Sequence, residues 1–153
     1  MYQKILVPLD GSELAECVLP HVEVLAGSGE VKEVVFVRVA EPFHQPSGDY
    51  VFNLEEIQKI DAQHRRDCGE YLKKISSKIN RGKASVKTEV LIGRPAEALA
   101  DYVSKHQIDL VVIATHGRSG VSRWIWGSVA DRILRSACAP VLMVRAPGCV
   151  PGV

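Results

Sequence analysis

Hydrophobic residues in this chain form short continuous runs that alternate with longer segments in which they recur every three or four positions. The short runs are typical of buried strands and the longer segments of helices. Their alternation predicts β-α-β units, and therefore a three-layer α/β sandwich in which helices cover both faces of an open parallel sheet. Five strands are predicted, at residues 5–9, 34–39, 86–92, 110–114 and 141–144.

The predicted strand at 86–92 differs from the others in its polarity. Val86, Thr88, Val90 and Ile92 alternate with the charged Lys87 and Glu89, whereas 5–9, 34–39 and 110–114 are almost continuously apolar. Continuous apolar runs are expected where helices cover both faces of a sheet. Alternation of apolar and polar residues is expected where one face is exposed to solvent. We therefore place 86–92 near an edge of the sheet. The strand order that we expect is 3-2-1-4-5.

Four helices are predicted between the strands. The first is capped by Ser12 and bent by Pro20, the second is long, the third opens at Arg94-Pro95, and the fourth opens at Ser128. Apolar stripes predicted to face the sheet comprise Leu14, Cys17, Val18, His21, Val22 and Leu25 in the first helix; Ile57, Ile60, His64, Cys68, Leu72, Ile75 and Ile79 in the second; and Val129, Ala130, Ile133, Leu134 and Ala137 in the fourth.

The length of 153 residues suits one domain, which we expect over 1–145. The tail 146–153 contains two prolines and two glycines and is expected to be flexible. The apolar runs are much shorter than the roughly 20 residues of a membrane span. The N-terminal residues lack the pattern of a signal peptide. A cytoplasmic protein that does not associate with membranes is the resulting expectation.

Charge narrows the range of partners. Lysine and arginine total 19 against 18 aspartates and glutamates, so the net charge of +1 gives no field that would attract nucleic acid in bulk. Locally the balance differs, because the segment from Arg118 to Arg135 contains four arginines and one aspartate, Asp131. The four cysteines are scattered without metal-ligand or redox spacing, which favours reduced, mostly buried thiols and no metal site.

Candidate chemistry lies at the carboxyl ends of the strands, where open α/β sheets bind their ligands. Asp10-Gly11-Ser12 follows the first strand, and its carboxylate could accept hydrogen bonds from a ribose; the same three residues fit a simple turn before a helix cap almost equally well. A glycine-rich turn, 115–120, follows the fourth strand and could approach phosphate oxygens. Gly127-Ser128 opens the fourth helix, whose free N–H groups form a potential anion site.

Taken together, these motifs resemble the universal stress protein family, of the UspA-like ATP-binding type. Ala114-Thr115-His116-Gly117, nine residues, and then Gly127-Ser128 look like the family's nucleotide-binding signature, with alanine in place of the first glycine. The opening run 4–12, Gly93-Arg94-Pro95-Ala96 and the run 140–144 are also typical of the family. The resemblance extends over essentially the whole chain.

The resemblance implies a Rossmann-like fold of the adenine nucleotide alpha hydrolase-like kind and a site for ATP. In this sequence the residues implied to bind the nucleotide are Pro8, Leu9 and Val39 at the adenine, Asp10 at the ribose, and Ala114, His116, Gly117, Arg118, Gly127, Ser128, Val129 and Ala130 around the phosphates. The sequence leaves open whether magnesium or manganese accompanies them. A homodimer formed through the last strand, Val141, Leu142, Met143 and Val144, is also implied.

The leading hypothesis is a stress-response or signalling module that acts by binding ATP and not by hydrolysing it. Two other functions remain open. One is a slow ATP hydrolase that uses Asp10 or His116, and the other is a dimeric scaffold that binds no nucleotide. Faster enzymes are disfavoured, because the sequence contains neither a P-loop nor a nucleophile elbow. We therefore expect a binding protein without catalytic residues.

Overall fold

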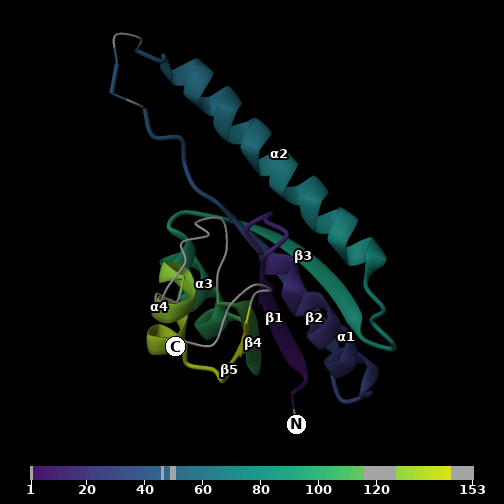
Figure 1. Cartoon of the computed structure of the whole chain (residues 1–153). Helices are drawn as coiled ribbons and strands as arrows, with labels where there is room; N and C mark the ends of the chain where they lie inside the picture. The colour runs from purple at the N-terminus through teal and green to yellow at the C-terminus, as the bar shows by residue number, and fades with distance from the viewer. Residues whose placement is uncertain (1, 46, 49–50, 116–126, 146–153) are drawn as a thin grey trace, which may run out of the picture.

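The computed structural model describes residues 2–45, 47–48, 51–115 and 127–145 (Figure 1). Five strands form one fully parallel sheet in the order β3-β2-β1-β4-β5. Their bounds are Lys4–Pro8 for β1, Glu33–Ala40 for β2, Ser85–Ile92 for β3, Leu110–Ala114 for β4 and Val141–Val144 for β5. The predicted α/β class and strand order are confirmed.

Helices cover both faces of the sheet and create two hydrophobic cores. The short 3-10 helix η1 (Ala15–Val18), α1 (Leu19–Gly27) and α2 (Leu54–Lys78) lie on one face, and α3 (Pro95–Lys105) and α4 (Ser128–Ser136) on the other (Figure 1). Successive residues of a strand point to opposite faces. Accordingly Phe36 of β2 packs in the core that includes Leu72, whereas its neighbour Val35 packs in the core that includes Leu99 and Ile133.

The two edge strands expose apolar side chains. β3 forms one edge, as its alternating pattern predicts, and Ile92 at its end is 57% exposed. β5, which contains the residues predicted for a dimer interface, forms the other edge, and Leu142 is 38% exposed. In the described part of the chain, no helix combines the length and the apolarity needed to cross a lipid bilayer.

The segment after β1 differs from the one continuous helix predicted there. Ser12 does cap the first turn, since its Oγ accepts a hydrogen bond from the N–H of Ala15 at 3.2 Å. The chain then forms η1, and Pro20 lies in the first turn of α1, where its missing N–H costs nothing. A 3-10 helix has three residues per turn, which shifts the buried stripe, so His21 is exposed instead of facing the core.

The predicted stripes need two further corrections. Leu134 of α4 is 46% exposed. It lies about 100° round the helix axis from the fully buried Ile133, at the rim of the stripe. In α2 the stripe is buried only at Cys68, Leu72 and Ile75, because the helix extends beyond the sheet at its N-terminal end (Figure 1).

The described cysteines are not in disulfide bonds, and they are not uniformly buried. Cys68 is buried, Cys17 is partly buried, and Cys138 is exposed, which contradicts the expectation for that residue. Burial raises the pKa of the Cys17 thiol. Cys149 and the tail 146–153 lie outside the described residues. Within the described ranges, no cluster of histidine, cysteine, aspartate or glutamate has the arrangement of a metal site.

Candidate functional site

A cavity of about 250 Å³ opens at the carboxyl ends of β1, β2 and β4, which are neighbours in the sheet although β4 is distant in sequence. Its walls come from both ends of the chain and from both helix layers. Every predicted nucleotide-binding residue that the structure describes lines this cavity: Pro8, Leu9, Asp10, Val39, Ala114, Gly127, Ser128, Val129 and Ala130. The predicted residues His116, Gly117 and Arg118 lie outside the described residues.

The turn after β1 holds Asp10 at the rim of the cavity. The Asp10 Oδ1 atom accepts hydrogen bonds from the N–H of Ser12 at 2.9 Å and from the Ser12 hydroxyl at 2.6 Å. A carboxylate that bonds the backbone two residues ahead stabilises a tight turn. Gly11, between them, has φ +87°, which glycine adopts without steric cost. Asp10 is therefore a turn former, as one interpretation of the sequence had it, and also a cavity residue.

The start of α4 supplies the electropositive side of the cavity. Gly127 is the N-cap residue; its N–H donates to the Thr115 carbonyl oxygen at 2.6 Å, and as a glycine it has no side chain that could cap the helix. The first N–H groups of a helix lack partners within the helix, and the helix dipole adds partial positive charge there. Since residues 127–130 line the cavity, these donors lie where an anionic group could bind.

Arg38 also lines the cavity, and the motifs did not identify it. Its guanidinium lies 5.0 Å from the centre of the Tyr71 ring. It also packs against Gly11, so closely that a Cβ atom added to this glycine would lie 2.8 Å from Arg38 Cζ. The Tyr71 hydroxyl donates to Glu16 Oε1 at 3.0 Å. Burial, and then the contact with Glu16, raise the pKa of Tyr71, so the phenol stays protonated. This chain of contacts fixes the β1 turn from the side of α2.

Glu41 and His64 also line the cavity, and the motifs did not identify them either. His64 belongs to the apolar stripe predicted for α2, and its interpretation as a core or boundary residue hid its position beside the strand ends. Glu41 falls in the loop after β2, which carried no motif. Two features of the sequence could have identified this part of the site. Arg38 is a charged residue inside an otherwise apolar strand, and Glu41 is a charged residue just after that strand. Both lie near the carboxyl end of the strand, where ligands bind.

Two of the four arginines in the basic segment predicted beside the site form local ion pairs. Arg135 Nε lies 3.1 Å from an Asp131 carboxylate oxygen, and Arg132 lies 3.6 Å from Glu97. Neither arginine lines the cavity. The other two arginines of this segment, at 118 and 123, lie outside the described residues. In the described part of the chain, the helix start and Arg38 therefore contribute the positive charge at the cavity.

Comparison with known proteins shows which family this chain is similar to. The sequence profile of the universal stress protein family matches residues 1–145. Universal stress protein MJ0531 of Methanocaldococcus jannaschii is 31% identical over 149 residues, an alignment that covers 96% of this chain and 84% of that protein.

Two similar solved structures contain an adenine nucleotide. One is a universal stress protein in complex with cAMP, with TM-score 0.61 and 20% identity, covering 95% of this chain and 98% of that one. The other is a universal stress protein family protein of Arabidopsis thaliana with AMP bound, with TM-score 0.65 and 14% identity, covering 95% and 93%. At these identities the likeness establishes the shared fold.

Proposed function

The chain belongs to the universal stress protein family, and on that premise we propose that its cavity binds an adenine nucleotide, with ATP the expected ligand. The observation that carries the proposal is that the Asp10 turn and the start of α4 at Gly127 meet in one cavity. Carboxylates bind ribose hydroxyls and helix starts bind phosphates. The nucleotides in the two similar structures support this assignment.

The strand order gives the ligand a direction. β2, β1 and β4 are consecutive in the sheet, and neighbouring strands lie about 4.8 Å apart. Phosphates would lie at the start of α4, the helix that follows β4, and the ribose at Asp10, in the turn that follows β1. The base would then lie at the end of β2, against Leu9 and Val39 and the aliphatic walls around them. Base, ribose and phosphates thus follow the strands in order.

We propose that this cytoplasmic stress-response module acts by binding ATP and does not hydrolyse it. Asp10 is the carboxylate expected beside the ribose, and its Oδ1 atom already accepts two hydrogen bonds from Ser12. A general base needs free capacity to take a proton at the reacting atoms. A single-turnover assay with radiolabelled ATP tests this point, and a rate clearly above that in buffer would favour the slow hydrolase instead.

Binding is tested first by mass spectrometry of small molecules released from freshly purified protein, and then by thermal unfolding with added ATP. At a concentration of 100 times its dissociation constant, ATP should stabilise the protein by about 2.7 kcal/mol, or roughly 5–10 °C for a chain of this size. Gly127→Val should remove the shift because its side chain enters the phosphate end, while Asp101→Asn, an exposed change on α3, should keep it. An unchanged shift in Gly127→Val contradicts the phosphate assignment, and no shift in the unmodified protein favours the scaffold without nucleotide.

The homodimer is proposed through the exposed edge of β5. Pairing of β5 with a second copy would cover Leu142 and satisfy the edge's free backbone groups. Light scattering should give twice the chain mass of 16.8 kDa. A monomer at micromolar concentration would contradict the proposal.

A further inference from the structure

A second cavity, of about 190 Å³, lies beside the first one, where the β2–α2 loop passes α2. It is lined by Ala40, Glu41, Pro42, Asp61, His64, Arg65 and Ile92. Glu41 and His64 line both cavities, so the two spaces meet at these side chains. Small-molecule sites start at about 300 Å³. Neither cavity reaches that volume alone, whereas the two joined do.

The polar side chains around the second cavity differ in what they already bind. Asp61 Oδ1 accepts a hydrogen bond from the N–H of Phe43 at 2.8 Å, and Arg65 Nε donates to the Asp61 carbonyl oxygen at 3.4 Å. Glu41 and His64 have no hydrogen bond or ion pair with any residue in the described ranges. The two groups at the junction are therefore those with free capacity for a ligand.

Glu41 and His64 lie on the side of the cavity where the base of the nucleotide is proposed to bind. Glu41 directly follows β2, and α2 packs on β2 and β3, whereas the anion-binding helix start follows β4 on the other side of β1. A nucleotide with its phosphates at α4 would thus present the edge of its base to Glu41 and His64. This step rests on the function proposed above.

We propose that Glu41 determines which base the site accepts, and that His64 forms the wall against which the base packs. An ionised carboxylate only accepts hydrogen bonds. The exocyclic amine of adenine is a donor and pairs with it, whereas the carbonyl oxygen that replaces this amine in hypoxanthine is an acceptor and is repelled. A site that hydrogen-bonds a group of its ligand strongly rejects an analogue that lacks this group. The substrate class selected is a 6-amino purine nucleotide.

The test compares ATP with inosine triphosphate by isothermal titration calorimetry. In the inosine base a carbonyl oxygen replaces the C6 amine, and N1 carries a proton that N1 of adenine lacks. The unmodified protein should prefer ATP by at least about tenfold. In Glu41→Gln the side-chain amide can donate to the carbonyl oxygen, so the preference should fall to within about twofold. Glu70→Gln, an exposed change on α2 outside both cavities, should keep the full preference.

His64 has a different expected signature. His64→Ala should weaken ATP and inosine triphosphate by the same factor, because it removes packing surface common to both bases, and the preference for ATP should stay. His21→Ala changes an exposed histidine on α1 and should affect neither affinity. Circular dichroism checks that every variant is folded.

The outcomes separate this inference from the function on which it rests. If the unmodified protein binds ATP without preference over inosine triphosphate, or if Glu41→Gln keeps the preference, the specificity role is overturned and nucleotide binding stands. If the unmodified protein binds neither nucleotide, the proposed function itself is overturned.

Discussion

The two halves of α2 have the same apolar periodicity but opposite environments. In the packed half, residues 66–78, Cys68, Leu72 and Ile75 are buried against the sheet. In the projecting half, residues 54–65, Leu54 is 72% exposed and Ile60 36% exposed. An apolar stripe therefore identifies a face of a helix but not what lies opposite that face, which depends on the length of the neighbouring elements.

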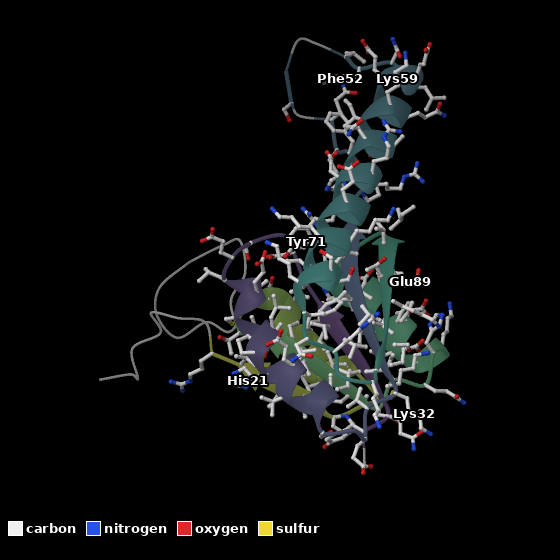
Figure 2. All side chains as sticks on the ribbon, turned by 90° about the vertical axis from the view of Figure 1, so that its right-hand side faces the viewer. His21, Lys32, Phe52, Lys59, Tyr71 and Glu89 are labelled. Atoms are coloured by element: carbon white, nitrogen blue, oxygen red, sulfur yellow. The ribbon has the colours of Figure 1, made fainter. Side chains whose placement is uncertain are left out.

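Geometry explains the difference. A helix of 25 residues is about 37 Å long, while the eight residues of β2 extend over about 26 Å. The helix therefore passes the carboxyl end of the sheet by several residues. Figure 2 shows Phe52 and Lys59 at its far end, away from the sheet, and Tyr71 at the level of the strands.

Local contacts replace burial in the projecting half. Asn53 and Glu56 form a reciprocal capping box, in which each side chain accepts a hydrogen bond from the other's backbone N–H at 2.9 Å. Asp61 binds the N–H of Phe43 in the preceding loop, and the rings of Phe43 and Phe52 meet edge to face at 5.0 Å. These contacts hold the loop on the helix and so hold Glu41 near His64.

The largest expected effect comes from truncating the packed half. Leu72→Ala should lower the free energy of unfolding by about 2–5 kcal/mol, because Leu72 is fully buried and the cavity left behind cannot refill. Ile60→Ala, at the partly exposed position of the same stripe, should cost under about 1 kcal/mol. Urea unfolding of both variants measures the contrast, and equal losses would show that the projecting half contributes to the cooperative core.

A smaller effect is expected from Tyr71, which links the packed half to η1. Tyr71→Phe loses the hydrogen bond to Glu16 and should cost about 1 kcal/mol at pH 7. The pKa of Tyr71 is raised by folding, so this contribution is complete below the ordinary value near 10 and is lost as the pH rises above it. The difference in unfolding free energy between the two proteins should therefore shrink above about pH 10. A constant difference would contradict a raised pKa of Tyr71 in the folded protein.

The smallest global effect is expected from the cap of the projecting half. Asn53→Ala removes a hydrogen bond worth about 1 kcal/mol to the first turns of α2. If this half opens locally, the amides of residues 58–62 should exchange with deuterium about fivefold faster while the thermal midpoint barely moves. A lower midpoint with unchanged exchange at 58–62 would mean that α2 unfolds as one unit.

The sequence predicted the features that depend on neighbours along the chain, and it missed those that depend on where an element ends in space. Strands are recognised from continuous apolar runs. Asp10 follows the first strand and Gly127 opens the helix after the fourth, so their meeting in one cavity could be predicted from the strand order. His64 could not be placed in this way, because its position depends on how far α2 passes the sheet. His21 was predicted to lie on the stripe that faces the sheet because a 3-10 turn before α1, which has a different period, gives no signal in the apolar pattern.

The position of β1 in the middle of the sheet also sets the order of events during synthesis. β1 pairs with β2 early, but its other neighbour, β4, lies about a hundred residues later, and the Asp109 carboxylate that binds the N–H groups of Gln3 and Lys4 at 2.9 and 2.8 Å arrives with it. Contacts between distant residues slow folding, and a growing chain emerges with its N-terminus first. The cavity needs Pro8 and Ala130 together, so it cannot form until most of the chain has left the ribosome. Capture of a ligand there would act as a check on the completed fold, favouring finished molecules over truncated ones.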